Sequence, residues 1–167
     1  MRKSPLACAI LWTTAIGIAC RAQTLPTTEG ETLSGHRVVL ARAVSGKSAV
    51  LIASFSKDAG PGCGEWSKAV RADSALAGVA VYEAAMLEQA PGFVRGMIKS
   101  SMRKGLSAAE QDNFLVFTQD ETLWRSYFGV TSDKDPWVVL IDAAGQVRWH
   151  GHGAVANLEP LLKSALP

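Results

Sequence analysis

The chain has 167 residues, of which 48% are hydrophobic and 19% are charged, and its formal net charge is +2. This length suits one domain with its own hydrophobic core, and the balanced composition excludes a disordered or fibrous protein. The small net charge gives no indication of nucleic-acid binding.

The first 22 residues have the pattern of a secretory signal peptide. Arg2 and Lys3 precede an uncharged run that ends at Cys20, and the small residues Cys20 and Ala22 suit cleavage before Gln23. We therefore expect an extracytoplasmic protein, periplasmic or secreted. A transit peptide, an uncleaved membrane anchor and lipid attachment at Cys20 are the alternatives.

Cleavage at this point changes both the charge and the cysteine content. It leaves 14 basic against 15 acidic residues, a net charge of −1, and it removes Cys8 and Cys20. Cys63 then has no internal disulfide partner, so in an oxidising compartment it must be buried, paired with another molecule or reactive.

Residues 23–36 are polar and rich in turn formers, so we expect an N-terminal tail in front of a domain that occupies residues 37–167. The continuous apolar run at 48–55 is typical of a strand buried on both faces. A Gly/Pro-rich loop, a helix with Trp66 and Val70 at helical spacing, and a second strand at 78–86 follow. This order predicts a parallel pair of strands joined by a right-handed crossover.

Residues 91–107 predict a basic amphipathic helix. Its apolar residues span one side, and basic residues recur every four positions beside them. One interpretation is a helix that packs on the core and has a solvated basic edge. The other is a patch that contacts an anionic membrane surface or an acidic partner through Arg95, Lys99, Arg103 and Lys104.

The remaining elements alternate between strands and helices. Residues 113–128 predict a short strand and then a helix that is capped at Thr118 or Asp120 and stops at Gly129. Two strands, 137–142 and 146–150, form a hairpin. A final helix begins near Asn157, because Pro160 fits only in a first turn.

This order of elements resembles the thioredoxin-like superfamily over about residues 31–166. Phe55 and Cys63 are separated as the strand aromatic and the second cysteine are in a thioredoxin motif, and Gly60 stands in place of the first cysteine. Pro136 corresponds to the cis-proline of that family. The resemblance implies a three-layer α/β/α sandwich with a helical insertion between the second strand and the following strand and helix.

A narrower resemblance is to the mitochondrial ATP synthase assembly factors. Trp66, the basic insert and the C-terminal motif carry it, and the motif residues are Val138, Leu140, Ile141, Asp142, Val147, Arg148, Trp149, Gly151, Gly153 and Ala154. An export signal and the Asp135-Pro136 entry to the strand depart from that family. The resemblance implies a role in assembling a membrane-protein complex.

A dithiol cycle needs two thiols, and this motif has only one cysteine. The sequence therefore favours a binding or assembly factor over an enzyme. We expect such a chaperone-like factor to need no cofactor and to bind a protein or peptide partner. If the Asp135-Pro136 bond is cis, the backbone beside it would pair with an extended segment. The candidate partner-binding residues are Asp135, Pro136, Trp137, Trp66 and Gly153.

Two other functions remain open. The first is a single-cysteine thiol oxidoreductase or peroxidase, in which the start of the helix lowers the pKa of Cys63 and His152 assists. The second is a copper or zinc carrier with Cys63, His150 and His152 as ligands, since sulfur and imidazole suit these metals.

Overall fold

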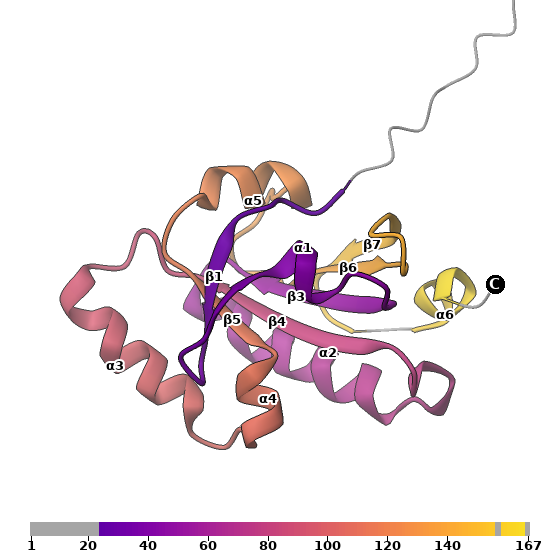
Figure 1. Cartoon of the computed structure of the whole chain (residues 1–167), viewed down its shortest axis with the longest axis horizontal. Coiled ribbons are helices and arrows are strands. Elements are labelled where there is room, and N and C mark those ends of the chain that lie inside the picture. Colours follow the sequence, from indigo (N-terminus) through magenta and orange to yellow (C-terminus); the bar gives the residue numbers. More distant parts are fainter. Residues whose placement is uncertain (1–23, 156–157, 166–167) are drawn as a thin grey trace, which may run out of the picture.

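The computed structural model describes residues 24–155 and 158–165, and these form one seven-stranded mixed sheet with helices on both faces (Figure 1). The strands lie in the order β2-β1-β5-β4-β3-β6-β7. Strands β3, β4 and β5 are parallel to one another, and the other neighbours are antiparallel. The strands are β1 (Glu29–Thr32), β2 (Arg37–Val39), β3 (Ala49–Ser54), β4 (Ala80–Met86), β5 (Phe114–Phe117), β6 (Trp137–Ile141) and β7 (Val147–His152).

The helices complete a three-layer α/β/α sandwich, which confirms the predicted thioredoxin-like fold. Helices α2 and α6 pack on one face of the sheet, and α1 and α5 pack on the other. Helices α3 and α4 form the predicted insertion between β4 and β5. The helices are α1 (Leu40–Ala43), α2 (Gly60–Ala72), α3 (Gly92–Arg103), α4 (Ala108–Asp112), α5 (Glu121–Phe128) and α6 (Glu159–Ala165).

Strand β3 lies in the interior of the sheet, and all six of its residues are buried, as its apolar run predicts. Side chains alternate along a strand, so Val50 and Ile52 enter the core under α2 and Leu51 enters the core under α5. The side chains of strand β6 alternate between the two cores in the same way. Neighbouring residues of one strand therefore belong to two cores that the sheet separates.

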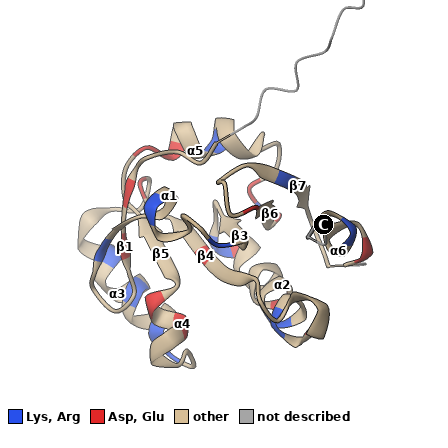
Figure 2. Cartoon of the chain, turned by 45° about the vertical axis from the view of Figure 1, so that its right-hand side comes forward, with Lys and Arg blue, Asp and Glu red and all other residues tan. Residues whose placement is uncertain are grey.

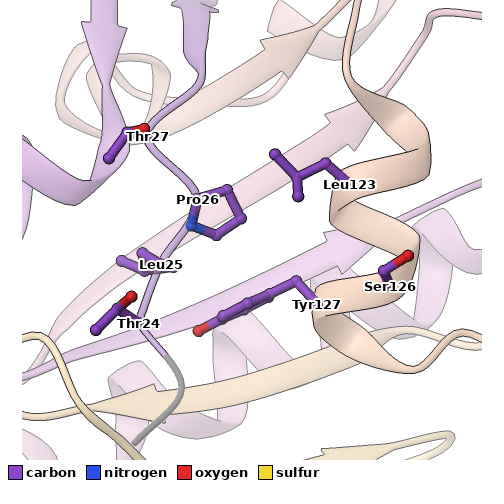
Figure 3. Close-up of a pocket in the computed structure, with 7 residues that line it drawn as sticks. All are labelled: Thr24, Leu25, Pro26, Thr27, Leu123, Ser126 and Tyr127. Atoms are coloured by element: carbon purple, nitrogen blue, oxygen red, sulfur yellow. The ribbon is translucent and has the colours of Figure 1, made fainter.

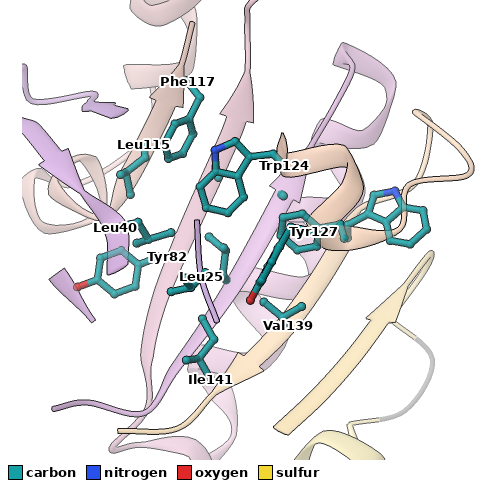
Figure 4. Close-up of a cluster of buried hydrophobic side chains, with 14 of the residues drawn as sticks. Leu25, Leu40, Tyr82, Leu115, Phe117, Trp124, Tyr127, Val139 and Ile141 are labelled. Carbon is teal, nitrogen blue, oxygen red and sulfur yellow. The ribbon is translucent and has the colours of Figure 1, made fainter. Parts of the chain in front are cut away.

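The core on the α5 side is rich in aromatic residues (Figure 4). Trp124 is fully buried, its ring centroid lies 4.8 Å from that of Phe117, and its indole Nε1 donates a hydrogen bond of 3.0 Å to Thr28 Oγ1. This bond satisfies a polar group that would otherwise be costly to bury. It also fixes the N-terminal segment on the core.

The prediction of an N-terminal tail at 23–36 is wrong for the described residues 24–36. Leu25 and Leu33 are buried, and β1 pairs with both β2 and β5. A Cβ atom at Gly30 would lie 2.8 Å from the Phe117 ring, so glycine permits this close approach. The segment joins the sheet through contacts with residues far along the chain, which a short polar sequence does not reveal.

Helix α5 begins after Asp120 and ends at Gly129, whose positive φ of 67° forms the predicted C-cap. The side chain of Asp120 makes no capping bond. Instead, the Glu88 carboxylate accepts a 2.7 Å hydrogen bond from the backbone N–H of Glu121. The N-terminus of α5 is therefore satisfied by a residue that lies just before the insertion.

Two predictions fall on residues outside the described ranges. The predicted signal peptide, residues 1–22, is one, and the predicted start of the last helix at Asn157 is the other. Helix α6 is described from Glu159, which places Pro160 in the first turn. None of the helices within 24–155 and 158–165 combines the length and apolar character needed to cross a bilayer.

Candidate functional site

Cys63 occupies the fourth position of α2, directly after the loop that leaves β3. Ser56 caps a short 3-10 turn by accepting the backbone N–H of Asp58, and α2 then begins at Gly60 with Pro61 in its first turn. Helical spacing turns Cys63, Trp66 and Val70 toward the sheet, where they pack with Val50. The cysteine is therefore part of the core on the α2 side.

The thiol of Cys63 is buried, and this environment raises its pKa. Its residue is 5% exposed, and burial, with a smaller contribution from the charge of Glu83, raises the pKa from 9.0 to about 12. The positive end of the helix dipole would favour thiolate, but desolvation opposes it and has the larger effect here. Cys63 is thus a protonated thiol at neutral pH, and the predicted lowering of its pKa is not found.

Glu83 on β4 shares this region and is itself partly buried. Burial raises its pKa, and a hydrogen bond from Ser67 and the nearby charge of Arg71 partly offset that effect. Ser67 also accepts a 3.1 Å hydrogen bond from Arg71 Nε. This polar group was not identified from the sequence, because Glu83 falls in an otherwise apolar strand whose register only the sheet defines.

Pro136 packs directly against the start of α2. A Cβ atom at Gly62 would lie 3.1 Å from Pro136 Cγ, so the absence of a side chain permits this close approach. The resemblance implied a cis peptide at Asp135-Pro136, but no peptide bond between described residues is cis. The Pro136 carbonyl accepts a 3.0 Å hydrogen bond from the N–H of Gly153, which extends the β6–β7 ladder by one residue.

Trp66 connects the same region to the end of β7. Its indole Nε1 donates a 2.8 Å hydrogen bond to the Gly153 carbonyl, and its ring packs 5.9 Å from the Trp149 ring. Gly153 has a φ of 82°, a left-handed conformation that favours glycine. Residues 56–62 and 131–136 contact each other, and Gly153 bonds to Pro136; together we call them the Pro136 end.

The predicted partner-binding residues at this end are mostly buried. Trp66 is 3% exposed and Trp137 is 2% exposed, and the Trp137 indole donates a hydrogen bond to the Ser132 carbonyl at 3.0 Å. Pro136 is buried as well, whereas Asp135 and Gly153 are half-buried. The two tryptophans therefore stabilise the Pro136 end from inside and offer little surface to a partner.

The two histidines lie on the opposite face of the sheet from Cys63. His152 pairs with Trp137 across the β6–β7 ladder and stacks on its ring at 4.5 Å, and His150 stacks on the same ring at 6.0 Å. Trp137 belongs to the core on the α5 side, while Cys63 belongs to the other core. The structure therefore does not bring His152 to Cys63 as predicted, although both lie near one end of the sheet.

The histidines have other partners. His150 Nε2 lies 2.9 Å from the Phe128 carbonyl, and His152 Nδ1 lies 3.6 Å from an Asp135 carboxylate oxygen. Within the residues that the structure describes, no three or more His, Cys, Asp or Glu side chains gather in a way that would hold a metal ion. The predicted ligands Cys63, His150 and His152 do not form a site.

An ion-pair network that the sequence analysis missed holds the loop before Pro136. Arg125 binds Asp133 through two hydrogen bonds of 2.6 and 2.9 Å, and it also binds Glu121 at 2.8 Å. The Asp133 carbonyl accepts a 2.6 Å hydrogen bond from Ser56 Oγ. Arg125 lowers the pKa of Asp133, mainly through these hydrogen bonds. Glu121 and Arg125 are four residues apart, and this spacing was the available signal.

The predicted basic patch is largely tied to the body of the protein. Lys99 forms a 2.8 Å ion pair with Glu31, Arg95 donates to the carbonyls of Ala90 and Glu88, and Arg103 donates to the carbonyl of Leu33. Lys104 is exposed at the end of α3. Figure 2 shows α3 and its basic segments at the margin of the molecule, beside the acidic segments of α4.

An open groove lies on the α5 side of the sheet, away from Cys63 (Figure 3). It is lined by the extended segment 24–27 and by three residues of α5, namely Leu123, Ser126 and Tyr127. Leu25 and Tyr127 are also members of the core on this side. The groove thus borders the aromatic core and not the predicted thiol site.

Neither family models nor curated protein sequences match this chain. Solved structures do. The exposed lipoprotein thioredoxin Etrx1 of Streptococcus pneumoniae is 18% identical with a TM-score of 0.54, and the match covers 82% of this chain and 96% of that chain. A thioredoxin-family thiol:disulfide interchange protein of Chlorobium tepidum is 22% identical with a TM-score of 0.56, covering 88% and 98%.

A third similar structure is BsSco, a member of the Sco family of cytochrome c oxidase assembly proteins. It is 12% identical with a TM-score of 0.59, and the match covers 88% of this chain and 96% of that chain. At these identities the similarity establishes the fold alone. The chain therefore has a thioredoxin-like fold, and the chemistry of its site has to be argued from its own residues.

Proposed function

We propose that this protein is a binding or assembly factor, chaperone-like in action, that uses the thioredoxin-like fold without thiol chemistry. The observation that carries the proposal is the state of Cys63, which is 5% exposed and has a pKa of about 12. A thiol that stays protonated and shielded is neither a nucleophile nor a good leaving group at neutral pH. Gly60 stands where the other cysteine of a dithiol would be.

The partner that we propose is a protein or peptide, including a membrane-protein complex in the process of assembly. The Pro136 end offers a rigid surface, because the Arg125–Asp133 pair and the Ser56 bond hold its loops. Pro61 and Lys134 are exposed there, and Asp135 is half-buried. A preformed surface loses little conformational entropy on binding, which supports a docking role.

The narrower assignment to an ATP synthase assembly factor rests on the C-terminal motif, and the structure gives that motif a packing role. A Cβ atom at Gly151 would lie 2.4 Å from Trp149 Cη2, Trp149 packs on Trp66, and Gly153 carries the positive φ. In this chain the motif therefore helps to pack the Pro136 end. We propose the assembly role from the resemblance of this motif, together with the extracytoplasmic location expected from the N-terminus.

Turnover assays test the proposal directly. Cys8 and Cys20 are first replaced by serine, so that Cys63 is the only sulfur nucleophile. The chain is then incubated with a reducible disulfide protein and, separately, with hydrogen peroxide, and Cys63→Ser is the matched control. We expect no turnover above that of the control in either assay. Turnover that depends on Cys63 would instead support the single-cysteine oxidoreductase or peroxidase.

A further inference from the structure

Helix α3 has an apolar side that the rest of the described chain leaves uncovered. It contains no buried residue, and Phe93 and Met97 are 88% and 69% exposed. They lie one turn apart on the same side of the helix. Among the described residues, the only other large hydrophobic side chain exposed to a comparable degree is Leu123, on α5, at 48%. Figure 1 shows α3 at the margin of the molecule, beyond β1 and β5.

The orientation of α3 is fixed by its basic residues. Arg95, Lys99 and Arg103 follow one another at four-residue spacing and bind, in order, the loop before α3, Glu31 of β1 and the Leu33 carbonyl after β1. Val94, Ile98 and Met102, on the adjacent side, are partly buried. At about 100° per residue, these contacts direct Phe93 and Met97 away from the body.

The same contacts leave most of the basic residues of this segment without an ion pair to another described residue. Within the described chain, only Lys99 of the four basic residues forms an ion pair with a carboxylate. Arg95 and Arg103 bind carbonyl oxygens, which orient a guanidinium group but carry no net charge. No acidic residue occurs from 90 to 109. The exposed apolar pair therefore sits within a positively charged segment.

We infer that α3 docks on the surface of an anionic lipid bilayer, with Phe93 and Met97 entering the boundary between headgroups and acyl chains. A bilayer combines negative charge with an apolar layer just beneath it, and this matches two exposed apolar side chains on a segment that has an excess of basic residues and the exposed Lys104 at its end. A stable protein interface buries roughly 800 Å² on each partner, which is far more than two side chains supply. The contact is a weak, reversible one.

This inference does not depend on the proposed function, because it uses no property of Cys63 or of the Pro136 end. It adds a second surface to the molecule. Docking of α3 on an anionic surface would give the protein a defined orientation on a membrane.

The test measures binding of the full chain to vesicles of phosphatidylcholine with phosphatidylglycerol and to vesicles of phosphatidylcholine alone. The test variant is Phe93→Ser/Met97→Ser, and the control is Leu123→Ser, which removes the other exposed apolar residue. All chains share the same N-terminus, so any membrane binding by residues 1–22 cancels in the comparison. Circular dichroism verifies that both variants remain folded.

We expect the double variant to lose at least about tenfold in affinity for anionic vesicles, since burial of two large apolar side chains is removed. Leu123→Ser should change it less than about twofold. Lys104→Glu should weaken binding several-fold, and added salt should do the same. Hydrogen exchange provides a local readout, because the amides of 92–103 should become more protected on anionic vesicles only.

Three results would overturn the inference. One is equal binding by the double variant and the wild type, with no added protection of 92–103. Another is equal protection on both kinds of vesicle, which would remove the role of charge. The third is self-association of the wild type without lipid that the double variant lacks, since this would assign the apolar side of α3 to a second copy of the chain.

Discussion

The Pro136 end and helix α3 differ in the exposure of their large apolar side chains. At the Pro136 end, Trp66 and Trp137 are buried and their indole N–H groups bind backbone carbonyls. On α3, Phe93 and Met97 project into solvent while basic residues hold the helix in place. The apolar side chains at the Pro136 end are therefore buried, whereas the inserted helix α3 exposes two of its apolar side chains.

This difference shows that the position of a residue in a familiar fold does not determine its use. Cys63 stands where the resemblance places a thioredoxin cysteine, but Trp66 and the surrounding core bury it. Among the described residues, no residue of α3 or α4 belongs to either core. Substitutions of apolar residues should therefore cost much more stability at the Pro136 end than on α3.

The largest effect is expected for Trp66→Ala. Removing a buried indole and its hydrogen bond to Gly153 should lower the free energy of unfolding by about 3–5 kcal/mol. The matched variant Phe93→Ala removes an aromatic side chain that is 88% exposed, and it should change stability by less than about 0.5 kcal/mol. Urea denaturation measures both. A similar loss in the two variants would contradict the contrast between the regions.

The next effect concerns pH. The pKa of Cys63 is raised from 9.0 to about 12 in the folded chain, so the folded state binds this proton more tightly than the unfolded state. The associated stability is fully present below pH 9 and is lost as the pH rises from 9 toward 12, at a rate of at most about 1.4 kcal/mol per pH unit. Urea denaturation of the wild type and of Cys63→Ala between pH 8 and 10.5 should show this additional loss only in the wild type.

Two parallel stability curves over that range would mean that Cys63 titrates alike in both states. That result would contradict the burial of the thiol. The comparison between the wild type and Cys63→Ala is needed because burial also raises the pKa of Tyr82 and Tyr127, and both tyrosines remain in the variant.

A smaller effect is expected for Gly153→Ala. The backbone of Gly153 has a φ of 82°, and a side chain in that conformation costs about 1–2 kcal/mol. Gly64→Ala is the control, because it lies in α2, has no neighbour within 4 Å of an added Cβ and should stabilise the helix by about 0.5–1 kcal/mol. Thermal unfolding compares them. Equal midpoints would show that the turn at Gly153 does not constrain the Pro136 end.

The smallest effect is expected for His152→Ala on the reactivity of Cys63. Because the sheet separates the two side chains, the rate of alkylation of Cys63 should change by less than about twofold. Zinc or copper should not slow that reaction either. A large change on removal of His152, or protection by metal that needs both residues, would show that they meet in solution.

Much of the fold could be predicted from local patterns in the sequence. The apolar run at 48–55, the spacing of Trp66 and Val70, and Gly129 after a helix each depend on neighbouring residues, and the structure confirms the elements that they predict. Strand β1 was missed because its four residues, Glu29–Thr32, have no apolar run. It is held by β5 and by Phe117 against Gly30, and such long-range contacts leave no local signal.

The site was harder to predict than the fold for a related reason. Alternation placed His150 and His152 on one side of β7, but it did not say which core that side would face. Only the register of Trp137 opposite His152 decides this. Trp66 and Trp137 are likewise apolar residues whose burial depends on the packing of α2 and of loop 131–136, and not on their neighbours in the sequence.

The most direct test of the central claim is the rate at which Cys63 is alkylated in the folded chain, compared with the urea-unfolded chain, as a function of pH. Peptide mass spectrometry resolves Cys63 from Cys8 and Cys20. A rise in pKa from 9.0 to about 12 predicts that the native thiol reacts about a thousandfold more slowly at neutral pH, before shielding is counted. Native labelling as fast as in urea, with a midpoint below pH 8, would contradict the account.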